Sequence, residues 1–505
     1  MKKHLITGLG IGFALTICTP LSADSIRNTP AEAEYYIQRI RSLDDAGPML
    51  NAVIAYNPDA AAEAAKVRST LPLGGRTVLV KDNIETRDFP TTAGSLALKD
   101  NWTRRDAPLI ANLRRAGGVV LGKTNLSEWA NIRGKDSTSG WSAIGGLTKN
   151  PFATDRNTCG SSSGSGAAVA AQLAWAAIGT ETNGSITCPA AINGIVGFKP
   201  SVGIVSRTHV IPISSTQDTA GPMTRTVADA GWLLNAIAGE DPGDAATLDA
   251  PRTDYSQDLL PVFAGDNLQG VRIGVMRNQI GDREDVEAIF GVALEDLERA
   301  GAILVDIEFE PNGKIFEDSF TVLMFELRRE MDAYLASIPE MASSNTPRSL
   351  ADLIAFNKAH KKEELRWFGQ ELFELAQTTA DQAAYEEARQ NAVRIAGEET
   401  LDMLLEKHDV TFLVAPTRGP AWVSDLVVGD NFNGSIGFGS PAAIAGYPHL
   451  TVPMGHVEGL PVGISFFGAK WADHDVLRAG AAYEAFRSAT LAKPTFSAWK
   501  PQAGD

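Results

Sequence analysis

The chain has 505 residues, which at about 150 residues per domain would suggest roughly three domains. Hydrophobic residues make up 44% and charged residues 21%, a composition typical of globular proteins, which excludes a wholly disordered chain. Acidic residues outnumber basic ones 61 to 45, so the formal charge of −16 lacks the basic surplus of a nucleic-acid-binding protein. Seven histidines, three cysteines and no HExxH or CxxC motif predict a protein without a metal site.

The N-terminus has the layout of a secretory signal peptide. A basic start at residues 1–4 precedes an apolar stretch over 5–18, and Leu21-Ser22-Ala23 offers a small-residue cleavage site. The stretch is shorter than the about 20 residues that span a membrane, and the bulky residue before Cys18 disfavours a lipoprotein. We therefore predict a signal peptide over 1–23 and an exported, periplasmic or secreted mature chain over 24–505, without stable membrane insertion.

Apolar periodicity predicts an α/β protein, because short β-branched runs indicate buried strands and apolar residues at three- and four-residue spacing indicate helices. The expected elements are a helix over 31–41, a strand at 78–80, a helix over 108–116, strands at 119–121 and 271–276, a helix over 286–297, strands at 302–307 and 411–415, and a mostly helical segment over 318–406. No linker richer in Pro, Gly or Ser than a loop divides them. One large domain around a helix-covered sheet is therefore expected instead of three domains.

The most unusual composition lies between residues 159 and 185. A Gly/Ser cluster at 159–166 runs directly into the Ala-rich stretch 167–177, which we expect to be a buried helix, and residues 179–185 are again rich in Gly, Thr and Ser. A flexible linker is the usual interpretation of such a cluster, but this one is short and leads straight into apolar sequence. A glycine-rich turn at a helix start presents unpaired N–H groups, which suit an anion or an oxyanion.

Two familiar motifs fit this cluster poorly. A phosphate-binding loop would require a lysine after its last glycine, and none follows. Residues 160–164 match G-x-S-x-G, which would make Ser162 a nucleophile with a distant histidine as its base. That motif needs an apolar strand immediately before it, whereas residues 152–158 are polar and loop-like, so this alternative is disfavoured.

A lysine is the alternative base. Lys81 ends the predicted strand at 78–80, and strand alternation places it on the opposite face from Asp82. A lysine in an apolar interior has a lowered pKa and can supply the neutral amine that a general base needs. On the residues alone, a lysine reaching from the strand end to water is the commoner arrangement.

Two cysteines, Cys159 and Cys188, remain after removal of the signal peptide. They could form a disulfide in an oxidising compartment. Sequence alone does not bring them together, and we expect two buried free thiols.

Several motifs together resemble the amidase signature family, and within it bacterial peptide amidases. The similarity covers most of the mature chain, in matching order and spacing. The motifs are Lys81-Asp82-Asn83, the cluster at 159–166, residues 179–191, Gly197-Phe198-Lys199-Pro200 and residues 218–229, with further similarity at 122–131, 139–143, 352–357, 414–417 and 445–448.

The resemblance implies a Ser–Ser–Lys triad without metal or cofactor, on a large mixed twisted sheet covered on both faces by helices. The family's nucleophile falls at Ser185, its bridging serine at Ser161 and its base at Lys81. It also implies a cis peptide bond between Gly160 and Ser161. The segment at 72–77 departs from the family pattern, which puts the surroundings of Lys81 in question.

Further roles follow from the same resemblance. The Ser162 hydroxyl would support the lysine, and Trp129 and Trp141 are candidate walls of the substrate pocket. The oxyanion hole would consist of the backbone N–H groups of Thr182, Asn183, Gly184 and Ser185.

The implied activity is hydrolysis of peptide C-terminal amides through an acyl-enzyme, with release of ammonia. Three alternatives remain. Two lie within the family: an amidase for small aryl or aliphatic amides, and the amidase component of a transamidating complex, whose intracellular tRNA substrate conflicts with export. The third is an inactive binding protein of the same fold.

Overall fold

A computed structural model describes residues 29–259, 268–340, 346–432 and 434–501. The predicted signal peptide lies outside these ranges. Within them, no helix combines the length and the apolar character needed to cross a bilayer.

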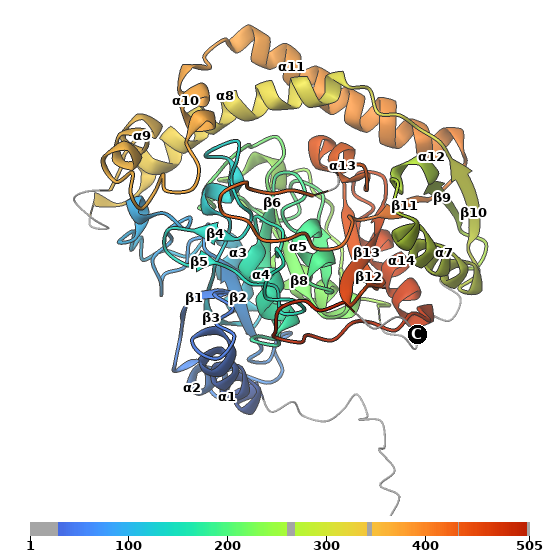
Figure 1. Cartoon of the computed structure of the whole chain (residues 1–505), viewed down its shortest axis with the longest axis horizontal. Helices are drawn as coiled ribbons and strands as arrows, with labels where there is room; N and C mark the ends of the chain where they lie inside the picture. Colours follow the sequence, from blue (N-terminus) through green and yellow to red (C-terminus); the bar gives the residue numbers. More distant parts are fainter. Residues whose placement is uncertain (1–28, 260–267, 341–345, 433, 502–505) are drawn as a thin grey trace, which may run out of the picture.

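Eleven strands form one mixed sheet that runs through the molecule (Figure 1). All the strands predicted from the sequence belong to it. Their spatial order is β1 (Val53–Tyr56), β3 (Val119–Thr124), β2 (Thr77–Lys81), β6 (Ala176–Glu181), β8 (Thr219–Thr224), β7 (Val196–Lys199), β12 (His449–Val457), β13 (Leu460–Phe467), β11 (Phe412–Pro416), β9 (Arg272–Met276) and β10 (Ile303–Ile307). Strands β4 (Trp141–Ser142) and β5 (Gly146–Leu147) form a separate two-stranded sheet.

Strand β2 lies between β3 and β6 and runs parallel to both. Every residue of β2 and β6 is buried, as expected for parallel strands covered on both faces. The unusual segment at 72–77 still leads into a regular strand, because Thr77 pairs with Val119. Since β2 and β6 are parallel, their carboxyl ends meet at the same edge of the sheet, which places Lys81 beside Thr180.

Helices cover both faces of the sheet. On one face α3 (Pro108–Arg115), α6 (Val227–Ile237), α14 (Asp473–Phe486) and α7 (Glu284–Arg299) pack against one another in a row. On the other, α4 (Ser163–Ala170) and α5 (Thr187–Ile192) pack together against the central strands. Helices α1 (Thr29–Arg39) and α2 (Ala60–Ala64) pack against each other, with α2 next to β3, and α13 (Gly439–Ala445) contacts β12. The predicted helices at 31–41, 108–116 and 286–297 correspond to α1, α3 and α7.

The segment over 318–406 is mostly helical, as predicted. It comprises α8 (Lys314–Ser337), α9 (Leu350–Ala359), α10 (Glu371–Thr378), α11 (Gln382–Ala396) and α12 (Met403–Lys407). The long helices α8 and α11 lie side by side and arch over the central elements (Figure 1). Buried residues of α8 such as Leu327 and Met331 pack in one cluster with Trp129 and Ile211. The helices therefore cover loops at the carboxyl ends of the central strands.

The predicted helix over 167–177 is wrong in extent. Helix α4 ends at Ala170, Gln172 adopts a left-handed φ of 57°, and Ala176 already belongs to β6. Alanine favours helices, but burial between two strands overrides that local preference. Close packing explains the glycines of α4, because a Cβ on Gly164 would lie 2.3 Å from the Ala52 carbonyl oxygen.

The expectation of two free thiols is also wrong. Cys159 and Cys188 form a disulfide with an S–S distance of 2.02 Å. Cys159 lies just before Ser161, and Cys188 lies just after Ser185. The pairing depends on the fold that brings these turns together, and no local feature of the sequence reports it. The disulfide joins the two turns that carry the predicted serines.

Removing this disulfide should lower the free energy of unfolding by about 2–4 kcal/mol, because the cross-link restricts the unfolded chain. The measurement is urea denaturation of the double variant Cys159→Ser/Cys188→Ser beside the parent protein. Mass spectrometry of the alkylated parent should detect no free thiol at either position. Two alkylated thiols in the parent, or equal denaturation midpoints for the two proteins, would contradict the expectation.

Candidate active site

Lys81 lies fully buried at the end of β2. Its Nζ donates to Ser161 Oγ at 2.7 Å and to Thr180 Oγ1 at 2.8 Å, and it lies 3.2 Å from the Thr180 carbonyl oxygen. Burial lowers the pKa of Lys81 from 10.5 to about 7, against the opposing effect of Asp218 and Glu181. The predicted base is thus an amine that is partly neutral near pH 7, and the alternative of a lysine reaching solvent is wrong.

Asp82, the next residue, points away from this cluster. Its Oδ1 lies 3.0 Å from Nζ of Lys123, and both side chains are buried. Strand alternation predicts this separation. Lys81 therefore keeps its nitrogen for hydroxyl and carbonyl oxygens, with no carboxylate of the described residues in ion-pair contact.

Ser161 and Ser162 lie in the turn before α4, and the peptide bond between Gly160 and Ser161 is cis, as the resemblance implies. Ser161 is buried, and its hydroxyl oxygen accepts the hydrogen bond from Lys81 Nζ. Ser162 Oγ donates to the Thr180 carbonyl at 3.1 Å and accepts from the Thr180 N–H at 3.2 Å. The predicted support of Ser162 for the lysine therefore passes through Thr180.

Ser185 lies half-buried in the turn between β6 and α5. Its carbonyl oxygen accepts a hydrogen bond from the Ser162 N–H at 3.1 Å, which ties this turn to the turn of Ser161. The Glu181 carboxylate holds the end of this turn, because it accepts hydrogen bonds from the N–H groups of Ile186 and Thr187 at 2.8 and 3.0 Å. The turns of Ser161 and Ser185, far apart in sequence, are thus tied to each other, and Lys81 bonds the first of them.

The backbone of this turn can receive a negative oxygen. No described group accepts a hydrogen bond from the N–H groups of Thr182 to Ser185. Gly184 has a φ of +85°, which favours glycine, and a Cβ there would meet no atom within 4 Å. Unpaired N–H groups in a turn with open space beside it suit the binding of an oxyanion.

The half-buried carboxylate of Asp218 fixes the start of the turn. Its Oδ1 accepts from Thr182 Oγ1 at 2.6 Å, and its Oδ2 accepts from the N–H groups of Ile213 and Ser214 at 2.8 and 2.9 Å. Burial raises the pKa of Asp218. Its charge favours protonated Lys81, so Asp218 limits how far burial lowers the lysine pKa.

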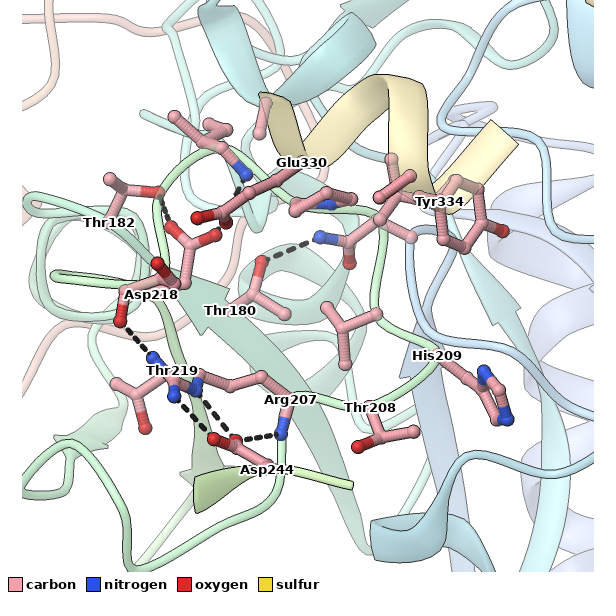
Figure 2. A pocket seen from close by; sticks show the side chains of 18 of the residues that line it. Thr180, Thr182, Arg207, Thr208, His209, Asp218, Thr219, Asp244, Glu330 and Tyr334 are labelled. Carbon is pink, nitrogen blue, oxygen red and sulfur yellow. Dashed lines mark hydrogen bonds and ion pairs between the residues drawn. The ribbon is translucent and has the colours of Figure 1, made fainter. Parts of the chain in front are cut away.

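A cavity of about 460 Å³ adjoins Thr180 and Thr182 (Figure 2). Thr180 and Thr182 form one wall of this cavity. Helix α8 forms another, from which Glu330 and Tyr334 reach toward the cavity (Figure 2). Apolar side chains between them include Val210, Ile211 and Ile213. The cavity can hold a mainly apolar group next to the turn of Ser185; we refer to it as the α8 cavity.

Trp129 and Trp141 are almost fully buried. Trp129 packs edge-on against Phe373 with ring centroids 5.7 Å apart, and Trp141 packs likewise against Phe368 at 5.4 Å. Both tryptophans have a packing role in the helical cover, and their contact with substrate stays a prediction.

Sequence reasoning missed the role of Thr180, which bonds Lys81, Ser162 and, through Oγ1, the Asn83 amide at 3.0 Å. It also assigned no role to Asp218. Both residues lie within the quoted motifs, so their positions were available, but their contacts join segments far apart in the chain. Glu330 and Tyr334 lie in α8, where no local pattern distinguishes a cavity wall from an outer face.

The family profile described as amidase matches residues 32–477 of the chain. The native peptide amidase of Stenotrophomonas maltophilia has a solved structure that is 47% identical, with a TM-score of 0.86, covering 93% of this chain and 95% of that one. A probable amidase of Arabidopsis thaliana is 36% identical over 89% of this chain and 85% of its own. A glutamyl-tRNA(Gln) amidotransferase subunit from Synechococcus is 33% identical, covering 91% of this chain and 89% of its own.

Family profile and relatives thus span nearly the whole described chain, including both serine turns and β2. The match supports an enzyme that hydrolyses amides. This chain belongs to the amidase family.

Proposed function

We propose that this enzyme removes the C-terminal amide of peptides, with Ser185 as nucleophile, Ser161 as proton relay and Lys81 as base. The observation that carries the proposal is the 2.7 Å hydrogen bond from Lys81 Nζ to Ser161 Oγ. Burial makes this amine a base near pH 7. The backbone bond between Ser162 and Ser185 holds the two serine turns together.

The reaction balances as carboxamide plus water giving carboxylic acid plus ammonia. Ser185 Oγ attacks the carbonyl carbon, its proton passes to Ser161, and the Ser161 proton passes to Lys81. The N–H groups of the turn stabilise the oxyanion, an effect typically worth about 10²–10³ in rate per donor. The proton then returns through Ser161 to the departing nitrogen, the C–N bond breaks, and water hydrolyses the ester on Ser185 by the reverse relay.

Two observations support a peptide as the acyl part. A peptide amidase is 47% identical over almost the whole chain. The α8 cavity of about 460 Å³ also offers apolar walls for a side chain next to the reacting carbonyl. The amidotransferase similarity is lower, at 33%, which makes a role in transamidation the second candidate.

Export belongs to the same proposal. The sequence of residues 1–23 supports it, and so does the Cys159–Cys188 disulfide, because disulfides persist mainly in oxidising compartments. Sequencing the N-terminus of the protein recovered from the periplasm or medium tests it. An intact Met1 on a cytoplasmic product would contradict export.

A peptide-amide library analysed by mass spectrometry tests the substrate class. The expected product is the free acid of each amide, with ammonia released and no backbone cleavage. A matched panel of benzamide-type and short aliphatic amides separates the peptide proposal from a small-amide enzyme. Conversion of the small amides alone would contradict peptide specificity, and ammonia release only from glutamine in the presence of partner proteins would favour the transamidating candidate.

The pH profile follows from the lowered pKa of Lys81. The protonated amine is not a base, so kcat/KM should be low in acid, rise through about pH 7 and level off above it. Asp218→Asn removes a charge that favours the protonated amine, so it should move the midpoint to lower pH. A profile that is flat between pH 5 and 9, or a midpoint that rises in Asp218→Asn, would contradict Lys81 as base.

A further inference from the structure

A second cavity, of about 270 Å³, adjoins the same turn at Asn183 and Gly184. Its walls also include Thr187, Arg418, Ser440 and His449. None of these residues lines the α8 cavity, which adjoins the turn at Thr182. The cavity at Arg418, which we call the Arg418 cavity, therefore approaches the predicted oxyanion groups from a separate direction.

Arg418 is a half-buried cation whose charge no described residue pairs. Its Nε is buried without a hydrogen-bond partner, and no described carboxylate lies within ion-pair distance. Its guanidinium stacks over the Phe432 ring, 4.5 Å from the centroid. Stacking covers a face of the planar group and leaves its N–H edges for a ligand, a geometry suited to bidentate binding of a carboxylate.

Two carboxylates influence the charge of Arg418, Asp430 and Glu181, and both accept hydrogen bonds from other groups. Asp430 accepts hydrogen bonds from the Ser139 N–H at 3.0 and 3.1 Å, and from Ser139 Oγ at 2.5 Å. Trp422 Nε1 adds a further bond at 3.3 Å. Asp430 therefore holds the Ser139 loop and leaves the charge of Arg418 available to a ligand.

His449, which also lines this cavity, carries a second unpartnered polar atom. His449 is 2% exposed, its Nε2 is bonded to Ser465 Oγ at 2.7 Å, and its Nδ1 has no hydrogen-bond partner. This Nδ1 faces the backbone at Gly439, where a Cβ would lie 3.4 Å away. An unpartnered buried nitrogen is costly unless a ligand or water satisfies it, so the cavity is built to receive polar groups.

We propose that Arg418 binds a carboxylate in the acyl part of the substrate, so that the enzyme prefers acidic carboxamides. The inference rests on the proposed peptide-amide hydrolysis, because it assumes that the amide reacts at Ser185. One continuous cavity joins Gly184 to Arg418. The carboxylate therefore belongs to the residue that carries the amide or to the residue before it.

Two pairs of acetylated dipeptide amides distinguish these two positions of the substrate carboxylate. Ac-Ala-Glu-NH2 is compared with Ac-Ala-Gln-NH2, and Ac-Glu-Ala-NH2 with Ac-Gln-Ala-NH2, so that each pair differs only in one charge. The expected result is a preference for the acidic member in at least one pair of about 10- to 100-fold in kcat/KM, the range of a hydrogen bond to a charged group. The Arg418→Gln variant should lose that preference, and Arg418→Lys should retain part of it.

Arg252→Gln is the matched control, because it removes the same charge from an exposed arginine paired with Glu240 at 2.9 Å. It should keep the parent preference. Equal kcat/KM within both pairs in the parent, or an unchanged preference in Arg418→Gln, would overturn the assignment.

A binding experiment separates this inference from the proposed activity. Calorimetry of the Ser185→Ala protein with each dipeptide amide measures recognition without turnover. Tighter binding of an acidic member, lost in Ser185→Ala/Arg418→Gln, supports the carboxylate site even if no peptide amide is hydrolysed. Equal binding of acidic and neutral members overturns it, whatever the activity on neutral peptide amides.

Discussion

Ammonia release from a peptide amide should fall by about 10⁴- to 10⁶-fold when Ser185 is replaced with alanine, the range seen when a catalytic serine is removed. Ser185→Ala deletes the oxygen that forms the acyl-enzyme, while the backbone N–H groups of the turn stay in place. The measurement is kcat/KM with one good peptide amide, using a coupled ammonia assay.

Two comparisons make this result specific. The circular dichroism spectrum and melting temperature of Ser185→Ala should match those of the parent, because Ser185 is half-buried and its side chain is small. Ser256→Ala, which changes a half-buried serine bonded to Asp254, should retain parent activity. Substantial ammonia release by folded Ser185→Ala would show that Ser185 is not the nucleophile.

The second large effect distinguishes two of the buried lysines, Lys81 and Lys123. Lys81→Met should lower kcat/KM by about 10²–10⁴-fold, the usual contribution of a positioned acid or base. Its free energy of unfolding should change by less than about 1.5 kcal/mol, because methionine fills a similar volume and no buried carboxylate loses an ion-pair partner. Activity and urea denaturation measure the two quantities.

Lys123→Met should show the opposite balance. Lys123 lies 3.0 Å from Asp82 with both side chains about 1% exposed, so its loss leaves an unpaired buried carboxylate. Breaking such a pair typically costs about 3–5 kcal/mol of stability. If Lys81→Met is the unstable variant and keeps its activity when folded, the assignment of roles to the two lysines is wrong.

The sequence predicted the elements that rest on local patterns. The run Val78 to Val80 predicts the strand that ends at Lys81, and alternation correctly separates Lys81 from Asp82. The family motifs also imply the cis bond before Ser161, which the structure contains. The strand and the separation of Lys81 from Asp82 depend on a few neighbouring residues, so local sequence is sufficient to find them, whereas the cis bond follows from the resemblance.

Contacts between distant segments were harder to predict. The Cys159–Cys188 disulfide and the end of helix α4 at Ala170 both depend on how the turns pack against the sheet. The place of α8 over the candidate active site depends in the same way on tertiary packing. Arg418 carries no local signal, since a lone arginine after a strand is ordinarily a surface residue, and only its unpaired environment distinguishes it.

If Ser185 carries the acyl group, its hydroxyl must also react with reagents that attack activated serines. A serine-directed fluorophosphonate probe followed by peptide mapping tests it directly. We expect one covalent adduct per chain, located on Ser185 and absent from Ser161 and Ser162, with labelling that rises through about pH 7 as Lys81 becomes neutral. An adduct on Ser161 or Ser162, or an unlabelled Ser185 in protein that releases ammonia, would contradict this expectation.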